Sequence, residues 1–170
     1  MYDVSLTELA PATSEPDLDV IFLYCTRPVT HMSERPPFHL AFPVNDLAEA
    51  RYFYGELLDC PEGRSSDEWV DFDFYGHQIV AHLSEEGITN ATNQVDGDNV
   101  PVRHFGVVLN MNEWRDIAQR LKDAGTKFIV EPHVRFAGQA GEQATLFVLD
   151  PSGNALEFKA FGDADRLFEK

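Results

Sequence analysis

Four polar residues lie among apolar neighbours in segments whose pattern is typical of β-strands. His39 and His104 each open such a segment, and His82 and Glu157 each lie on a later one. A polar cluster in an apolar concavity needs compensating partners, and a divalent metal ion supplies them. Imidazole and carboxylate ligands suit Fe(II), Mn(II), Co(II), Ni(II) and Zn(II), and two imidazoles with one carboxylate leave positions open for a substrate. These residue types therefore indicate a metal centre.

The elements that must position these residues follow one another twice along the chain. A strand, a helix and a run of further strands occupy residues 38–83 and again residues 103–161. Asn45 and Asp46 cap the first helix, and apolar residues three and four positions apart follow them. The pattern predicts two modules of the same βαβββ type.

The polar residues themselves follow this repeat. In an alignment of the two halves, His39 matches His104 with an offset of 65 residues, and His82 matches Glu157 with an offset of 75. Because the offset grows along the chain, an insertion is expected in the second half, at residues 136–143. Side chains alternate along a strand, and the apolar neighbours of each residue face the helices, so the four polar side chains face the other side. In two modules related by a pseudo-symmetry axis, equivalent positions lie on either side of that axis. We therefore predict that the four side chains converge at the centre of a cupped sheet.

The segments that open the first half and close the second half carry a known pattern. Residues 39–47 read HLAFPVNDL, with Phe53 and Tyr54 behind them, and residues 150–157 read DPSGNALE. Together with the repeat, these segments resemble the vicinal oxygen chelate superfamily, which contains glyoxalase I, extradiol dioxygenases, fosfomycin-resistance enzymes and bleomycin-binding proteins. The resemblance covers residues 36–162. It implies an α+β fold in which two βαβββ modules form a cupped mixed β-sheet.

The resemblance also implies a ligand set, with His39, His104 and Glu157 binding one divalent metal ion. Glyoxalase I-like members usually carry a glutamate ligand and base at the position of His82, so the histidine argues against a glyoxalase I activity. The role of His82 stays open between a fourth ligand, an acid–base group, a donor to a ligand and passive packing.

The favoured activity is that of a dioxygenase-like oxidoreductase. It would use Fe(II) and a small-molecule substrate that chelates the metal through two vicinal oxygens, with His82 moving a proton. Mn, Co, Ni or Zn are alternative metals. A glyoxalase-type lyase or isomerase is an alternative activity. A metal-free small-molecule binding protein is a third, which the retained metal residues disfavour.

Three further residues are candidates for contacts with the substrate. Arg135 stands beside the predicted insertion, where its guanidinium could hold a substrate anion. Asp73 lies on an alternating strand that either projects into the cup or forms an exposed acidic face. Phe147 lines the pocket in one reading and packs in the core in the other.

The composition excludes several kinds of partner. Lys and Arg number 13 against 29 Asp and Glu, which gives a net charge of −16. So acidic a surface repels nucleic acid and anionic lipid. No apolar run approaches the ~20 residues of a membrane span. Two cysteines are too few for a disulfide framework, and a reduced cytoplasmic setting is expected.

The domain organisation is read from a change in composition near residue 36. Residues 1–35 are rich in proline and acidic residues and form an N-terminal extension, either a mobile arm or a strand that packs on another subunit. Residues 36–162 form the superfamily domain, and residues 163–170 form a C-terminal tail. A homodimer is one option for the oligomeric state.

Overall fold

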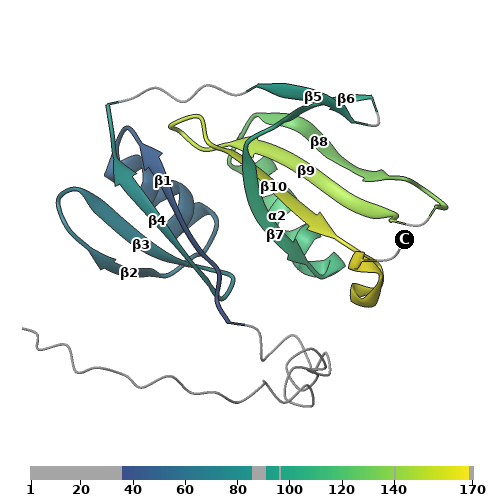
Figure 1. Cartoon of the computed structure of the whole chain (residues 1–170), viewed down its shortest axis with the longest axis horizontal. Helices are drawn as coiled ribbons and strands as arrows, with labels where there is room; N and C mark the ends of the chain where they lie inside the picture. The colour runs from purple at the N-terminus through teal and green to yellow at the C-terminus, as the bar shows by residue number, and fades with distance from the viewer. Residues whose placement is uncertain (1–35, 86–90, 96, 140, 169–170) are drawn as a thin grey trace, which may run out of the picture. The chain divides into compact units, whose positions relative to one another are not determined.

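The protein is described by a computed structural model, and Figure 1 shows its course. The residues described are 36–85, 91–95, 97–139 and 141–168. The N-terminal extension predicted over residues 1–35 lies outside them. The compact unit that carries all the elements below begins at Pro37.

The first module contains a strand, a helix and three further strands. Its elements are β1 (His39–Val44), α1 (Leu47–Ala50), the π-helix η3 (Arg51–Leu57), β2 (Glu62–Ser65), β3 (Trp69–Phe74) and β4 (His77–Leu83). The strands form a sheet in the order β1-β4-β3-β2, with β1 and β4 parallel and the other neighbours antiparallel.

The second module repeats this arrangement. Its elements are β7 (His104–Leu109), α2 (Met111–Asp123), β8 (Phe128–Arg135), β9 (Gln143–Leu149) and β10 (Ala155–Ala160), followed by the short 3-10 helix η4 (Ala164–Phe168). The strand order β7-β10-β9-β8 matches that of the first sheet, again with one parallel pair. The predicted α+β fold of two βαβββ modules is confirmed, and each module has a mixed four-stranded sheet.

The chain forms a hairpin between the two modules. Its antiparallel strands are β5 (Thr92–Val95) and β6 (Asp98–Pro101). Three of the four residues of β5 are polar and all four are exposed, so β5 carries no alternating apolar signal, which is why the sequence did not predict it. Val100 packs against Val130 and Phe147 on the second sheet, so the hairpin covers part of that sheet.

Both module helices begin at the residues that their sequences favour. The carboxylate of Asp46 accepts hydrogen bonds from two backbone N–H groups in the first turn of α1. Asn110 caps α2 in the same way, and Glu113 returns a bond to the backbone of Asn110, which completes a capping box. These caps fix where each helix leaves its opening strand.

The helix-covered faces of the two sheets meet in one hydrophobic core. Residues of both sheets and of the helices α1, η3 and α2 belong to a single buried cluster. Across the module boundary, the rings of Phe42 and Phe105 lie 5.1 Å apart, and those of Phe74 and Phe158 lie 6.2 Å apart. Because side chains alternate along a strand, the opposite face of each sheet points away from this shared core.

The closing motif of the sequence ties the two modules together. Tyr54 donates a 2.8 Å hydrogen bond to Asp150 Oδ2 in the buried interior. Asn154 donates to the same carboxylate, and also to the backbone carbonyl of Pro43 at 2.8 Å. Burial raises the pKa of Asp150, and the hydrogen bonds from Asn154 and Tyr54 oppose that rise. Residues in this motif thus hold the modules against each other.

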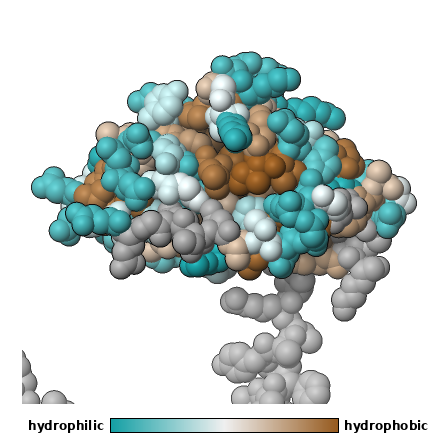
Figure 2. Space-filling view, turned by 90° about the horizontal axis from the view of Figure 1, so that it is seen from above, coloured by the Kyte–Doolittle hydropathy of each residue, from teal (hydrophilic) through white to brown (hydrophobic). Residues whose placement is uncertain are grey.

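The surface around the core is mixed in character. The space-filling view in Figure 2 shows hydrophilic side chains surrounding a central patch of hydrophobic ones. No helix in the described part of the chain is long and apolar enough to cross a membrane.

Candidate metal site

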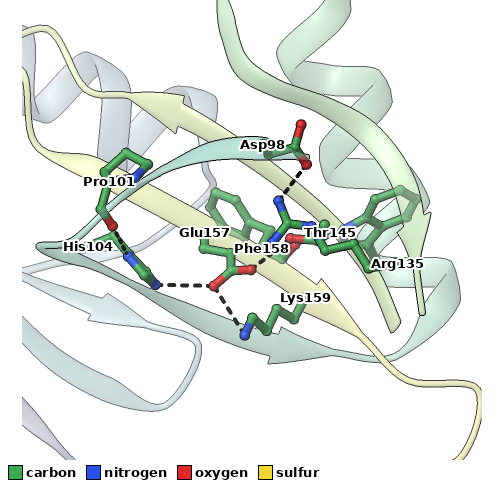
Figure 3. Close-up of polar contacts among 9 residues, drawn as sticks. Asp98, Pro101, His104, Arg135, Thr145, Glu157, Phe158 and Lys159 are labelled. Atoms are coloured by element: carbon green, nitrogen blue, oxygen red, sulfur yellow. Dashed lines mark hydrogen bonds and ion pairs between the residues drawn. The ribbon is translucent and has the colours of Figure 1, made fainter. Parts of the chain in front are cut away.

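A histidine and a glutamate come together on the outer face of the second sheet, the face opposite the helices (Figure 3). The parallel strands β7 and β10 place His104 opposite Ala155 and Gly106 opposite Glu157. His104 Nε2 lies 3.2 Å from Glu157 Oε2. A Cβ atom at Gly106 would overlap the carbonyl oxygen of Glu157, so only glycine permits this close approach of the strands.

The ring of His104 is held in one orientation. Its Nδ1 lies 2.6 Å from the carbonyl oxygen of Pro101, at the end of β6. A carbonyl only accepts, so Nδ1 carries a hydrogen and Nε2 faces the carboxylate. The hydrogen bond with Glu157 raises the pKa of His104, and the bond to Pro101 adds to this rise while burial opposes it.

Glu157 is a buried carboxylate with both oxygens engaged. Oε1 accepts a 2.8 Å hydrogen bond from the hydroxyl of Thr145, and Oε2 receives Lys159 Nζ at 3.2 Å as well as His104. Burial alone would raise the pKa of Glu157, but His104, Lys159 and Thr145 together bring it below its ordinary value. The group is therefore an anion at neutral pH, which is the state that a metal ligand requires.

His39 lies on the outer face of the first sheet and is also held through Nδ1. Nδ1 lies 2.8 Å from Gln78 Oε1, and Gln78 Nε2 donates a 2.9 Å bond to Asp71 Oδ2. The buried carboxylate of Asp71, which Arg64 approaches at 3.5 Å, only accepts. It therefore fixes the amide of Gln78, and the amide oxygen fixes the hydrogen of His39 on Nδ1. The Nε2 lone pair of His39 is left in the form that binds a metal.

The predicted convergence of four side chains does not occur within one chain. His39 and His82 lie on the first sheet, and His104 and Glu157 lie on the second. The two outer faces point away from the shared core rather than toward each other. Over the described ranges, no group of three His, Cys, Asp or Glu side chains is placed to hold one metal ion.

The strand register also corrects the repeat. His39 pairs with Gln78 and His104 pairs with Ala155, so the structural equivalent of Glu157 in the first module is Val80. The predicted equivalence of His82 with Glu157 is therefore wrong by two residues.

The corrected register gives His82 a different counterpart. His82 pairs with Pro43, and Lys159 pairs with Val108 at the matching step of the second module. His82 thus corresponds to Lys159. It is exposed and lies on the same face of β4 as Gln78, two same-face positions further along.

The predicted substrate residues lie in three different settings. Arg135 is buried, with Nη2 2.6 Å from Asp98 Oδ2 and its guanidinium 5.9 Å from the centre of the Phe147 ring. Phe147 is fully buried opposite Glu157, with its ring 5.1 Å from that of His104.

Asp73 has a local role in the first sheet. Its Oδ1 accepts a 2.7 Å bond from the backbone N–H of Gly76, in the turn between β3 and β4. Arg135 and Phe147 therefore lie beside the His104–Glu157 pair, and Asp73 supports a turn of the other module.

A pocket of about 260 Å³ lies next to the His104–Glu157 pair. Its lining comes from β7 and β10: His104, Phe105, Gly106, Val107, Val108, Glu157 and Lys159. Neither Lys159 nor Gln78 was predicted from the sequence. Alternation on one strand could have indicated Lys159, two residues after Glu157, whereas Gln78 is found only once the pairing of β1 with β4 is known.

The chain resembles proteins of one superfamily over most of its length. The family model described as "Glyoxalase/Bleomycin resistance protein/Dioxygenase superfamily" matches residues 37–158. A crystal structure of a glyoxalase/bleomycin resistance protein/dioxygenase from Alicyclobacillus acidocaldarius is 34% identical, with a TM-score of 0.66, and the match covers 78% of this chain and 96% of that chain.

More distant structures share the fold. The fosfomycin resistance protein FosX from Listeria monocytogenes, in its monoclinic form, is 16% identical, with a TM-score of 0.61 over 78% of this chain and 98% of that one. An integron cassette protein from the Halifax Harbour sewage metagenome is 22% identical, with a TM-score of 0.57 over 75% of this chain and 99% of that one. No curated protein matches the chain. On the family match and the 34% identical relative, this chain belongs to the glyoxalase/bleomycin resistance protein/dioxygenase superfamily.

Proposed function

We propose that the protein is a metal-dependent enzyme that acts on a small molecule through two neighbouring oxygens of that molecule. The observation that carries the proposal is the His104–Glu157 pair beside a pocket. The carboxylate is anionic although it is buried, and the imidazole is oriented with Nε2 toward it. His39, His104 and Glu157 are the proposed ligands.

The donor atoms fit a divalent transition metal. Both histidines are fixed by a hydrogen bond from Nδ1, and such an outer partner is the usual companion of a metal-binding histidine. Two imidazoles and one carboxylate suit Fe(II), the favoured metal, and also Mn, Co, Ni or Zn. When bound, the ion would polarise the substrate oxygens as a Lewis acid and, if it is iron, support chemistry with dioxygen.

The three ligands require a second copy of the chain. β1 and β7 are the edge strands of their sheets, and His39 and His104 occupy equivalent positions on them. A two-fold related copy that placed its β1 beside β7 would bring its His39 toward the His104–Glu157 pair. We therefore propose a homodimer with two shared sites.

His82 is the proposed acid–base group. It lies on the same face of the first sheet as His39, at the position that corresponds to Lys159 in the second module. In the proposed dimer it faces the same space as the substrate. Val80 offers no donor where the carboxylate lies in the second module, which favours a three-ligand, dioxygenase-like site over a four-ligand, glyoxalase-type one.

Complementation between two inactive variants tests the shared site. His39→Ala and Glu157→Ala should each purify without metal, because each lacks a ligand in both sites of the dimer. After the two are unfolded together and refolded, mixed dimers have one intact site, and metal content should recover to about a quarter of the wild-type level. Metal-free wild-type protein would refute the metal site, and no recovery in proven mixed dimers would refute its shared nature.

The reaction class is tested separately on the iron-loaded protein. Oxygen uptake with catechols is expected if the site is dioxygenase-like. Turnover of hemithioacetals without oxygen uptake would instead support the lyase alternative.

A further inference from the structure

Lys159 places a positive charge on the wall of the pocket. It follows Glu157 by two residues on β10, so both side chains lie on the same face of the sheet. Its side chain is 32% exposed, against 7% for Glu157, and its stem lies across from Val108 on β7. The ammonium points to the carboxylate of Glu157 (Figure 3), and Lys159 is one of the residues that line the pocket.

The ammonium is paired with an oxygen that a bound metal would also use. Lys159 Nζ lies 3.2 Å from Glu157 Oε2, and His104 Nε2 lies at the same distance from that atom. In the part of the chain that the structure describes, Glu157 is the ion-pair partner of Lys159. A divalent cation on this oxygen would repel the ammonium, because like charges a few ångströms apart disfavour each other.

A displaced ammonium could pair with another anion. Its neighbour Val108 is apolar, and the protein as a whole, with a net charge of −16, disfavours anions near its surface. The flexible four-carbon stem allows Nζ to swing into the pocket without any movement of β10. An oxygen anion of the substrate is the partner that the pocket can accept there.

We propose that Lys159 is a substrate-binding residue that holds a negatively charged oxygen once the metal has taken Glu157. This inference rests on the proposed function and adds the class of substrate: a small anion such as a carboxylate or a catecholate. Lys159 then acts in turn on two partners. Without metal it neutralises Glu157, and with metal bound it would attract the substrate.

Substitution of Lys159 by methionine separates this role from a structural one. Co(II) affinity should rise about tenfold in Lys159→Met, because a competing positive charge is removed from Glu157. The affinity of the Co(II)-loaded protein for oxalate, a dianion with vicinal oxygens, should fall at least about tenfold. Calorimetric titrations measure both, and the cobalt absorption spectrum reports whether oxalate still enters the metal's ligand shell.

Two control variants make the result specific. Lys159→Arg keeps the charge and should retain oxalate affinity within about threefold. Lys122→Met makes the same change in net charge on α2 and should change neither affinity. Weaker Co(II) binding in Lys159→Met, or unchanged oxalate affinity, would overturn the inference while leaving the proposed metal site standing. Wild-type protein that binds no Co(II) would instead overturn the proposed function on which the inference depends.

Discussion

The outer faces of the two modules have the same strand order but different chemistry. The second module carries a charged cluster in which Glu157 meets His104 and Lys159. The first carries two imidazoles: His39, held by the neutral amide of Gln78, and the exposed His82, with apolar Val80 in place of the glutamate. A duplicated scaffold can therefore divide a metal site unequally, with the charge on one half and one neutral ligand on the other.

Glu157→Gln should remove the negative charge that distinguishes the second module, and it should have the largest effect of these variants on metal affinity. The amide keeps the shape of the side chain but loses the anion, so metal affinity should fall more than about 100-fold, beyond the loss that outer partners of ligands cause. Metal content after dialysis against limiting Co(II) measures this. Glu131→Gln, which removes a charge from an exposed position on β8, is the control. Full metal content in Glu157→Gln would remove the glutamate from the ligand set.

His82→Ala tests whether the first module contributes chemistry beyond one ligand. As an acid–base group, His82 should be dispensable for metal binding, whereas turnover should fall by ~100- to 10,000-fold. Metal content and rate are measured on the same sample. His77→Ala alters the opposite face of the same strand and serves as the control. Metal lost together with activity would make His82 a ligand and give the first module a second donor.

Much of this comparison could be predicted from the sequence. The spacing of apolar residues predicted both modules and their helices, and the polar cap predicted at Asn45 and Asp46 is found at Asp46. The offset between His39 and His104 also matches the strand starts. Local spacing determines these features, so one sequence is sufficient to find them.

Register and packing could not be predicted in the same way. The pairing of β4 with β1 depends on contacts between strands, and a shift of two residues keeps the same face, so His82 was set against Glu157 in place of Val80. Likewise, alternation shows which face is polar but not whether two polar faces meet. The packing of both helix-covered faces in one core decides that.

Gln78→Leu should weaken the first module's contribution without removing it. The hydrogen bond that keeps the proton of His39 on Nδ1 is lost, so the ring can rotate and change tautomer. Loss of such an outer partner typically costs ~10- to 100-fold in metal affinity. Long-range ¹⁵N NMR of the metal-free variant should show the proton moving to Nε2 of His39 while His104 is unchanged. An Nδ1 proton retained on His39 would mean that Gln78 does not set the tautomer. Gln94→Leu in the hairpin is the control.

Tyr54→Phe should give the smallest effect, and it tests whether the modules unfold together. The variant removes one 2.8 Å hydrogen bond across their boundary and leaves Asp150 with its bonds from Asn154 and Ser152. Removal of one hydrogen-bond donor from a buried carboxylate lowers the free energy of unfolding by about 1–3 kcal/mol. The melting temperature should therefore fall, while one cooperative transition remains. Two transitions would show that the modules unfold separately.

The pH dependence of the stability of Tyr54→Phe identifies the group that the Tyr54 hydroxyl stabilises. Burial raises the pKa of Asp150, and the hydrogen bond from Tyr54 opposes that rise because it favours the anion. Without the hydroxyl, the pKa of Asp150 in the folded state should rise further above its value in the unfolded chain. When the pKa of a carboxyl group is higher in the folded state, the protein keeps its full stability at pH values below the pKa of the unfolded state. It loses stability as the pH rises through the pKa of the folded state. The difference in stability between wild type and Tyr54→Phe should therefore be largest near neutral pH and should shrink in acid, where Asp150 is protonated. Urea unfolding at several pH values measures this difference, and a constant difference across that range would show that the hydroxyl acts through packing alone.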